Sequence, residues 1–368
     1  MPAITFKVDS VSGSARAGLV VTPHGAVETP TFMPVGTQGT VKCLTPLQVR
    51  EVGSGIVLAN TYHLMLRPGA EIVANAGGLQ KWSGWGGPML TDSGGYQVFS
   101  LSELAEISDE GVRFRSHIDG KALFLSPEEA IKIQNQLGAD IIMQLDDCVG
   151  YPAERYRVNE SIRRTADWAR RSIDAHSRKD QALFGIVQGS TYKDLRRESA
   201  LGLADLDLPG YAIGGVSVGE GSALIREVVG ATVELLPEEK PRYLMGVGPP
   251  VDVLDAVADG IDMFDCVVPT RNGRNGWAFT FKGLVKVKNS VHAAAEDPIE
   301  EDCDCYTCRG FSRSYIRHLF KAGEMLGMTL VSLHNLRFYA RLMEKARDAI
   351  RAGEYEAYRR EVSGAFGK

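Results

Sequence analysis

The regular alternation of short apolar segments with amphipathic ones restricts the fold more than any other feature of this sequence. Eight apolar segments have the length of β-strands, and most of the stretches between them have helical periodicity. The predicted strands are 32–35, 55–59, 88–91, 140–145, 182–187, 211–213, 243–245 and 261–267. The predicted helices are 126–137, 159–179, 191–204, 223–236 and 249–259. Eight such units predict an α/β fold of the (β/α)8 or TIM barrel type, with an open doubly wound sheet as the alternative.

Two segments interrupt this alternation. Residues 112–125 alternate with period two around Asp119-Gly120, which predicts an inserted β-hairpin with a type I′ turn. From Trp277 onward the pattern changes to short strands, an acidic tract and a cysteine cluster. We therefore predict a single barrel domain over residues 1–368, with a small zinc-binding subdomain inserted at about 277–338.

The cysteine cluster predicts the metal site of this subdomain. Cys303, Cys305 and Cys308 form a C-x-C-x-x-C pattern, and His334 follows on a helical segment. Three thiolates and one imidazole make a closed tetrahedral set, which is typical of one structural Zn²⁺ per chain. His318 is an alternative fourth ligand, and a cluster without metal is the other interpretation. The remaining cysteines are scattered along the chain, which favours a metal site in a reducing compartment over a disulfide framework.

The charge distribution predicts a local site for a polyanion. The net charge of −5 offers no general attraction, but residues 267–295 contain no acidic residue. Basic residues recur in that segment and again, at every fourth position, in the next: Arg271, Arg274, Lys282, Lys286, Lys288, Arg309, Arg313, Arg317 and Lys321. Such clusters are typical of nucleic-acid binding, and a solvated helix face is the alternative. With no leader-like segment and no long apolar run, the chain is expected to be cytoplasmic and without a membrane partner.

Polar or flexible residues follow the predicted strands, where barrel enzymes build their active sites. These residues are Asn60, Asp92, Asp146 with Asp147, Gln188, Gly214 with Gly215, Gly246 and Asp265. After Asp92, two glycines would let a ligand approach the backbone, and Tyr96 offers a face for a planar ring. A pair of carboxylates such as Asp92 and Asp265 suits retaining chemistry at a glycosidic carbon. Helix N-capping is the alternative for any single aspartate.

Several motifs together resemble one enzyme family. They are LANTYHLMLRPG, TDSGGYQVFSL, QLDDC, GIVQG, AIGGVSVGE, YLMGVG, DMFDCVVPTRNGRNG and CDCYTC with its distal histidine, in that order over about residues 30–334. The sequence is similar to bacterial tRNA-guanine transglycosylases (the queuine tRNA-ribosyltransferase family). The resemblance implies exchange of guanine at the wobble position of a tRNA anticodon for 7-aminomethyl-7-deazaguanine (preQ1). It also implies a covalent enzyme–ribose intermediate and a place in queuosine biosynthesis.

The resemblance assigns a role to each site residue. Asp265 would be the nucleophile and Asp92 the general acid/base. The residues implied to bind the base are Asp146, Gln188, Gly215, Ser93, Tyr96, Met245, Cys148 and Val216, the last in place of the usual leucine. Asn60 and Gln97 would support the carboxylates, while Arg271, Arg274 and Lys286 would contact the tRNA. Cys148 and Val218 match the bacterial pattern, which implies the small deazapurine base preQ1 as substrate rather than queuine.

A homodimer is also expected, because Phe311, Tyr315 and His318 share the spacing of one helical face and resemble the family's dimer contact. Core packing is the alternative for these three side chains. Two other functions remain open at this level. A glycoside hydrolase would need sugar-stacking tryptophans, and none of the four in this chain directly neighbours Asp92 or Asp265 in sequence. A zinc-bearing RNA-binding subunit without activity would not need both carboxylates.

Overall fold

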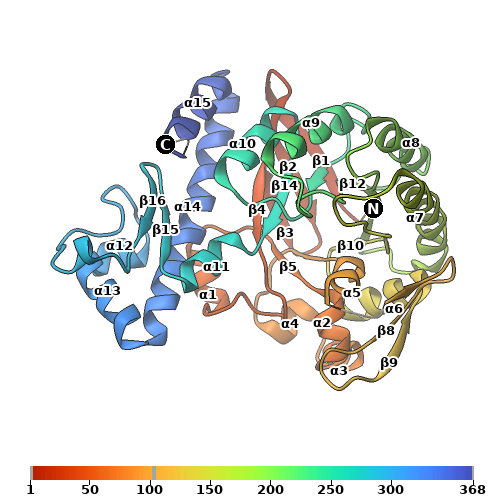
Figure 1. Ribbon diagram of the computed structural model, residues 1–368, viewed down its shortest axis with the longest axis horizontal. Helices are drawn as coiled ribbons and strands as arrows, with labels where there is room; N and C mark the ends of the chain where they lie inside the picture. The colour runs from red at the N-terminus through yellow and green to blue at the C-terminus, as the bar shows by residue number, and fades with distance from the viewer. Residues whose placement is uncertain (1–2, 102–104, 367–368) are drawn as a thin grey trace.

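The computed structural model describes residues 3–101 and 105–366 and contains one large parallel sheet (Figure 1). Its strands run in the order β4-β14-β13-β12-β11-β10-β6-β5. Their bounds are β4 (Thr31–Pro34), β5 (Val57–Ala59), β6 (Met89–Thr91), β10 (Ile141–Met143), β11 (Ala182–Val187), β12 (Gly210–Ile213), β13 (Arg242–Leu244) and β14 (Met263–Cys266). The end strands β4 and β5 meet through a bridge between Val35 and Leu58 and a 2.6 Å hydrogen bond from Gly36 N–H to the Leu58 carbonyl. The sheet is thus a nearly closed barrel, which confirms the predicted TIM fold over the open sheet.

Helices cover the outside of the barrel (Figure 1). They are α1 (Pro46–Glu51), α2 (Thr61–Leu66), α3 (Ala70–Asn75), α4 (Leu79–Ser83), α5 (Gly95–Leu101), α6 (Pro127–Leu137), α7 (Arg155–Ala175), α8 (Lys193–Ala204), α9 (Ser222–Val233), α10 (Pro250–Ala258) and α11 (Val268–Arg274). Helices α6 to α10 are the five predicted ones. Helix α7 begins and ends four residues before the predicted 159–179, because Glu154 is its N-cap and the backbone at His176 is extended. Of the helices that the structure describes, none is long and apolar enough to cross a membrane.

Alternate residues of each strand face opposite sides of the barrel wall, as the pleat requires. One set packs together in the barrel interior: Met33, Leu58, Leu90, Met143, Ile186, Ala212, Tyr243 and Met263. The residues next to them pack in the larger cluster with the helices: Phe32, Val57, Met89, Ile142, Val187, Ile213, Leu244 and Phe264. Asp92 lies two residues after Leu90, and Asp265 lies two residues after Met263. The same alternation therefore turns both carboxylates toward the barrel axis at the C-terminal end of the strands.

A three-stranded antiparallel sheet closes the opposite end of the barrel. Its strands are β1 (Thr5–Ser12), β2 (Ala15–Thr22) and β3 (Gly25–Thr29), and the sequence analysis identified none of them. Ile4, Val20 and Val27 pack with the residues of the barrel interior. The buried Arg16 guanidinium donates a 2.8 Å hydrogen bond from Nε to Asp262 Oδ1 and so ties this sheet to the start of β14. Water is thereby kept from the N-terminal end of the barrel.

The predicted hairpin is present, but its predicted turn is wrong. Strands β8 (Val112–Arg115) and β9 (Ala122–Leu125) pair antiparallel, and β7 (Glu106–Ile107) adds a third strand to β8. The last strand pair is Arg115 with Ala122, so the loop is longer than a two-residue turn, and Asp119 lacks the positive φ of a type I′ turn. The Ser116 hydroxyl accepts hydrogen bonds from the N–H groups of Ile118 and Asp119 instead. These side-chain bonds add to the backbone hydrogen bonds that close the loop, from the Ser116 N–H to the Lys121 carbonyl (2.9 Å) and from the Gly120 N–H to the Ser116 carbonyl (2.8 Å).

The C-terminal subdomain projects from one side of the barrel (Figure 1). It contains β15 (Trp277–Thr280), β16 (Gly283–Lys286), the short helix η1 (Ser290–His292), α12 (Tyr306–Gly310) and α13 (Arg313–Ala322). The predicted basic stripe is not on one helix, because α12 ends before Phe311 and Ser312 caps the start of α13. Arg313 also donates a 2.9 Å hydrogen bond to Asp297, so only part of the stripe is free to meet a partner.

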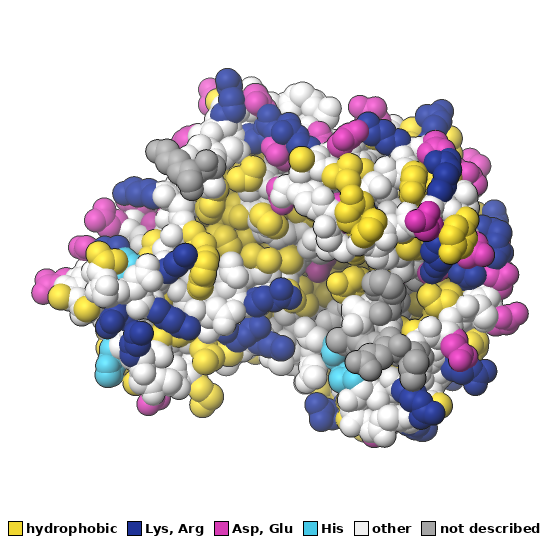
Figure 2. Space-filling model, viewed as in Figure 1, with side chains coloured by type: hydrophobic (Ala, Val, Ile, Leu, Met, Phe, Trp, Pro, Cys, Tyr) yellow, Lys and Arg dark blue, Asp and Glu magenta, His cyan; other side chains and the backbone are white. Residues whose placement is uncertain are grey.

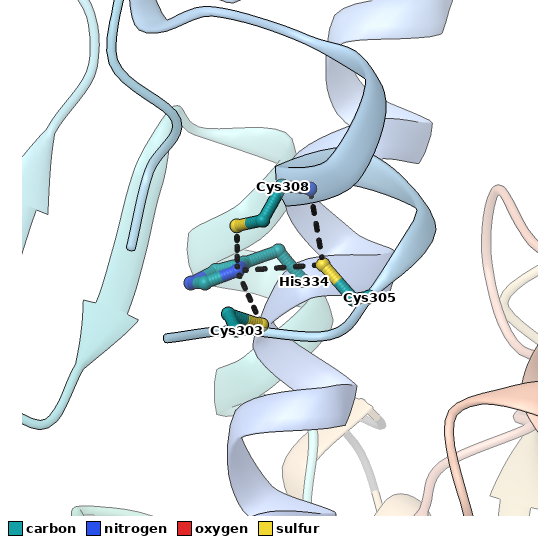
Figure 3. A group of neighbouring side chains, drawn as sticks. All are labelled: Cys303, Cys305, Cys308 and His334. Carbon is teal, nitrogen blue, oxygen red and sulfur yellow. Dashed lines mark hydrogen bonds between the residues drawn. The ribbon is translucent and has the colours of Figure 1, made fainter. Parts of the chain in front are cut away.

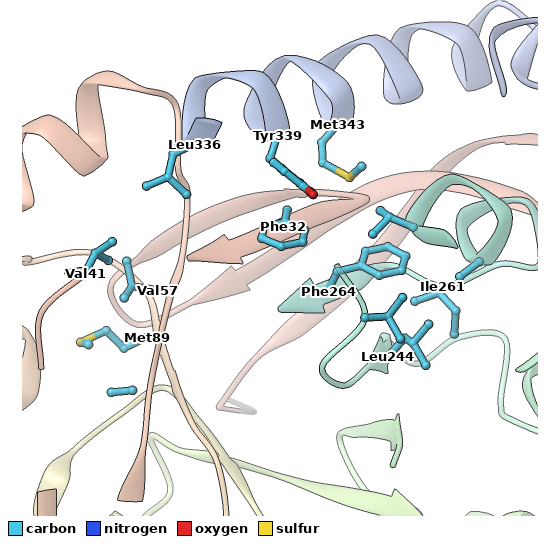
Figure 4. Packing of buried hydrophobic residues seen from close by; sticks show 14 of the residues in the cluster. Phe32, Val41, Val57, Met89, Leu244, Ile261, Phe264, Leu336, Tyr339 and Met343 are labelled. Carbon is cyan, nitrogen blue, oxygen red and sulfur yellow. The ribbon is translucent and has the colours of Figure 1, made fainter. Parts of the chain in front are cut away.

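Helix α14 (Met325–Arg351) joins the subdomain to the barrel. Figure 4 shows Leu336, Tyr339 and Met343 on this helix packing toward Phe32 of β4 and Phe264 of β14. The rings of Phe32 and Tyr339 are 4.4 Å apart between centroids. The helix continues past residue 338, where the predicted subdomain ends, and α15 (Tyr355–Phe366) follows it. One rigid element is therefore shared by both parts of the chain.

Candidate active site and metal centre

The C-terminal ends of the barrel strands surround a hollow on one face of the protein (Figure 2). Asp265 ends β14 on one side of it, and its Oδ1 accepts hydrogen bonds from the Tyr243 hydroxyl (2.6 Å) and the Gly246 N–H (2.9 Å). Burial raises the pKa of Asp265, and these two hydrogen bonds oppose the rise. No donor in the described parts of the chain is hydrogen-bonded to Oδ2. That oxygen is therefore left available for a contact with a ligand.

Asp92 follows β6 and is held from the neighbouring strand end. Its Oδ1 accepts a 2.8 Å hydrogen bond from the Thr61 N–H, and its Oδ2 accepts one from the side-chain amide of Asn60. Burial raises the pKa of Asp92 to about 6, and the charge of Asp265 adds to the rise, while Asn60, Thr61 and Gln97 lower it. A carboxyl with this pKa changes its protonation state close to neutral pH.

Asp92 directly follows β6 and Asp265 lies on β14, so both carboxylates stand at the C-terminal end of the barrel, and the charge of Asp265 contributes to the raised pKa of Asp92. The pKa of Tyr243 lies well above its usual value, first because of burial, then because of the charge of Asp265 and, less strongly, that of Asp92. Like charges influence one another in this way only at short range or through a poorly screened medium. The arrangement required by the sequence hypothesis, two acidic groups at one mouth, is thus present.

A third buried carboxylate, Asp146, forms a hydrogen-bonded set with Ser93 and Gln188. The Ser93 hydroxyl donates to Asp146 Oδ1 (2.9 Å), and the Gln188 side-chain amide donates to Oδ2 (2.7 Å). Burial raises the pKa of Asp146 to about 6, and neighbouring Asp147 contributes to the rise. Gly95 is required here, because a Cβ at this position would lie 2.8 Å from the Asp146 carbonyl oxygen. The sequence suggested that Gly95 lets a ligand approach the backbone, whereas in the structure it allows the close approach of Asp146.

The raised pKa of Asp146 predicts a pH-dependent stability. Its folded-state pKa of about 6 exceeds the ordinary aspartate value of 3.8, so this group stabilises the fold at low pH and the stabilisation is lost as pH rises through about 6. Asp146→Asn removes the charge. The difference in free energy of unfolding between this variant and the parent should therefore shift in favour of the variant by about 2 kcal/mol as the pH rises from about 4 to about 8. Urea unfolding at both pH values measures this change. Asp109→Asn is the control of opposite sign, because paired arginines lower the pKa of exposed Asp109. An equal response of both variants would contradict the prediction.

The remaining predicted base-binding residues have different exposures. Tyr96, on α5, is 48% exposed, and Met245 is half-buried at the end of β13. Cys148 is buried beside Asp146, whose charge, after burial itself, raises the pKa of the thiol. Val216 is buried in the large hydrophobic cluster.

The predicted RNA contacts lie toward the subdomain side of the hollow. Arg271 and Arg274 are in the last turn of α11, directly after the strand that carries Asp265. Nη1 of Arg274 is buried without a hydrogen-bond partner among the described residues. Lys286, on β16, lies over the Trp277 ring at 4.4 Å from its centroid. Figure 2 shows Lys and Arg side chains along the subdomain side of the hollow and over the subdomain itself. A basic surface beside the hollow suits a polyanion that enters it.

Three residues that hold the site were missed from the sequence. Tyr243 and Thr61 bond the two carboxylates, and Arg196, on α8, donates to backbone carbonyls of Gly214 and Gly215. Tyr243 looks like any apolar strand residue, and Arg196 looks like a surface residue of an amphipathic helix. Only the position of Thr61 after Asn60, at a strand end, was a usable signal.

Cys303, Cys305, Cys308 and His334 form a buried cluster whose ligand atoms lie within 4.8 Å of one another (Figure 3). The three sulfur atoms are 3.6, 3.7 and 3.3 Å from His334 Nδ1. Nε2 of the same ring lies 2.8 Å from the Phe279 carbonyl oxygen, so it carries the proton and leaves Nδ1 as the ligand atom. His318 instead stacks near Tyr315, so its alternative role as a ligand is wrong. The donor set fits a tetrahedral metal ion.

The chain is similar to known proteins over nearly its whole length. A family model described as Queuine tRNA-ribosyltransferase matches residues 9–368. A protein of that name from Pelotomaculum thermopropionicum is 56% identical over 356 residues, which cover 97% of this chain and 96% of the relative. Another from Acetivibrio thermocellus is 56% identical over 96% of this chain and 95% of its own length. A third from Staphylococcus aureus is 52% identical over 100% of this chain and 98% of its own length.

Proposed function

The chain belongs to the queuine tRNA-ribosyltransferase family, and we propose that it exchanges guanine at the anticodon wobble position for preQ1 through a covalent enzyme–ribose intermediate. The family implies a transferase that replaces a guanine base of tRNA in queuosine synthesis. The observation that carries the proposal is the pair of electrostatically coupled carboxylates, Asp92 and Asp265, at one hollow. Their different surroundings suit two different roles.

Asp265 is proposed as the nucleophile. Its Oδ1 is engaged by Tyr243 and Gly246, which fixes the carboxylate plane and leaves Oδ2 for attack on the ribose C1′ atom. The new C1′–Oδ2 bond forms as the C1′–N9 bond breaks, and the departing guanine takes the electron pair. The incoming base then reverses the step. Because the phosphodiester bonds take no part, the tRNA strand stays intact.

Asp92 is proposed as the general acid/base. Guanine needs a proton as it leaves, and the incoming base must lose one as it attacks C1′. A carboxyl with a pKa of about 6 can supply the first proton and accept the second near neutral pH. Asn60 and Gln97 are proposed to support this function, since both lower the pKa of Asp92 and Asn60 donates a hydrogen bond to its Oδ2.

Asp146, Ser93, Gln188 and Gly215 are proposed to read the edge of the base. A carboxylate accepts hydrogen bonds from the N1–H and 2-amino groups of guanine, whereas amide N–H groups donate to its 6-oxygen. The hydrogen bonds from Ser93 and Gln188 to Asp146 hold the carboxylate in place for this purpose. Tyr96 and Met245 are proposed to cover the two faces of the base, as in other pockets for extruded nucleobases.

Cys148 and Val218 are proposed to favour a small base, and Val216 is proposed to bind the base with them. Cys148 is buried beside Asp146, and Val218 is half-buried on the loop after β12. Arg271, Arg274 and Lys286 are proposed to contact the anticodon loop. Their position on and after α11, next to Asp265, would bring a phosphate backbone to the rim as its base enters the hollow.

The metal centre is proposed to hold one structural Zn²⁺ and to stabilise residues 277–338 within a single barrel domain. A homodimer is also proposed. The Phe311 and Tyr315 rings stack at 5.6 Å between centroids, and Tyr315 and His318 follow at 6.5 Å, although Phe311 precedes α13. Tyr315 is 40% exposed, so this aromatic row offers contact area to a second copy. Light scattering that gave the mass of one chain at micromolar concentration would refute the dimer.

Labelled guanine and an unmodified tRNA with a wobble guanine provide the test of the proposed function. Incorporation of label into tRNA, competed by unlabelled preQ1 and less by the larger base queuine, supports the proposal. Release of free base without incorporation would indicate a hydrolase. If a correctly folded protein binds tRNA but shows neither incorporation nor release of base, it is a binding subunit and the proposed exchange is refuted.

A further inference from the structure

Arg196 is a buried arginine without an acidic partner. Its side chain, on α8, is 1% exposed, and no carboxylate in the described parts of the chain forms an ion pair with it. Burial lowers the pKa of Arg196 to about 10, so the guanidinium remains charged at neutral pH. Such a group is costly to bury unless its donors are well satisfied. The hydrogen bonds of the Arg196 guanidinium therefore indicate the function of this side chain.

The guanidinium donates to three backbone carbonyls on two loops of the active site. Nε donates to the Ser190 carbonyl (2.7 Å), Nη1 to that of Gly214 (2.9 Å) and Nη2 to that of Gly215 (3.0 Å). Ser190 lies two residues after Gln188, at the end of β11, and Gly214 directly follows β12. The planar fork thus ties two adjacent strand ends together.

These bonds fix the direction of two peptide groups. The peptide bonds between residues 214 and 216 are not among the cis bonds of the described chain. In a trans peptide the carbonyl and the following N–H point in opposite directions. Because Arg196 attracts the carbonyls of Gly214 and Gly215, the N–H groups of Gly215 and Val216 point away from it. Backbone donors are thereby presented in a fixed orientation.

The surrounding contacts leave this loop little freedom to turn. A Cβ on Gly215 would lie 2.2 Å from Gln188 Oε1, and one on Gly189 would lie 2.7 Å from Arg196 Cγ. Gly215 has a φ of +60°, which favours glycine. The loop is therefore packed between Arg196 on one side and Gln188, a proposed base-reading residue, on the other.

We propose that Arg196 is a positioning residue for base recognition, which holds the Gly215 and Val216 N–H groups toward the acceptor edge of the bound purine. This inference rests on the proposed function, because it takes the bound molecule to be guanine or its deaza analogue. The 6-oxygen of that base is an acceptor, which a backbone N–H satisfies and a carbonyl would repel. Arg196 touches neither the base nor the ribose in this arrangement.

Arg196→Met tests the inference, because methionine retains much of the volume and none of the donors. The inhibition constants of guanine and of 2-aminopurine, which lacks the 6-oxygen, are measured against tRNA exchange or by direct binding. We expect the affinity for guanine to fall by about tenfold or more, with the affinity for 2-aminopurine nearly unchanged. The KM for tRNA should stay within about twofold of the parent, since phosphate contacts carry that affinity.

Arg242→Met is the matched control. Arg242 is also buried, its pKa is also lowered to about 10, and it donates to the Leu236 carbonyl, but it lies at the start of β13, away from the site. It should lose stability without a change in the guanine to 2-aminopurine ratio. An unchanged ratio in folded Arg196→Met would overturn the inference.

If Arg196→Met does not fold, the ratio of the affinities for guanine and 2-aminopurine is measured in Arg196→Lys. Lysine keeps the charge but not the planar fork, so this ratio should also fall. A parental ratio in this variant would likewise overturn the inference. A parent protein that binds guanine without incorporating it into tRNA would refute the proposed function alone. In that case the ratio of the affinities for guanine and 2-aminopurine, measured by direct binding, would still test the role of Arg196.

Discussion

Asp265→Asn is expected to lower kcat for guanine exchange by about 10⁴-fold or more, because it removes the proposed nucleophile. The amide can still accept hydrogen bonds from Tyr243 and Gly246, so the fold and the affinity for tRNA should persist. The covalent complex with tRNA, which the parent protein should show on a denaturing gel, should be absent. Single-turnover exchange and the gel together measure the effect.

Tyr243→Phe is the graded control for this prediction. It removes one hydrogen bond to Oδ1 and keeps the ring that fills the barrel interior. A hydrogen bond to a charged group contributes about 1.5–3 kcal/mol, so kcat should fall by about 10- to 100-fold. The covalent complex should still form in this variant. A complex that survives in Asp265→Asn would remove Asp265 as the nucleophile.

Loss of the metal ion is expected to unfold the C-terminal subdomain and abolish tRNA binding. Structural zinc contributes about 10 kcal/mol or more to the folding of small domains, and this subdomain has few other sources of stability. The effect should extend to α11, because Asn335, next to His334, donates a 2.9 Å hydrogen bond to the Pro269 carbonyl. Hydrogen exchange in residues 277–322 and tRNA binding are measured before and after treatment with a chelator.

Cys308→Ser and Cys43→Ser separate metal loss from a general effect of cysteine removal. Cys308 belongs to the buried cluster, whereas Cys43 is exposed and outside it. We expect Cys308→Ser to lose both zinc and tRNA binding and Cys43→Ser to keep one zinc per chain. The barrel should bind guanine in both variants, because Asp92, Asp146 and Gln188 lie at the ends of barrel strands outside residues 277–338. Full zinc content in Cys308→Ser would exclude the proposed ligand set.

The architecture was predictable because its signals are local. Apolar runs that alternate with capped amphipathic segments indicate βα units whatever the rest of the chain does, and all eight barrel strands were found in this way. The N-terminal sheet was missed, because β1 is half-exposed and has no long apolar run. The hairpin turn was misjudged because the loop between the last strand pair is longer than two residues, and the Ser116 side chain accepts hydrogen bonds inside it.

The same distinction between local and tertiary information applies to the residues of the site. The sequence by itself determined which groups stand at the strand ends, among them Asp92, Asp146 and Asp265, and which three cysteines can bind a metal ion, because strand alternation and ligand spacing are properties of neighbouring residues. The choice of His334 over His318 as the fourth ligand required the fold. Only the tertiary structure decided the environment of those groups. The raised pKa values of the carboxylates, the bond from Tyr243 and the fork of Arg196 all depend on residues distant along the chain. Burial and hydrogen-bond direction exist only once the barrel has closed, so no local pattern encodes them.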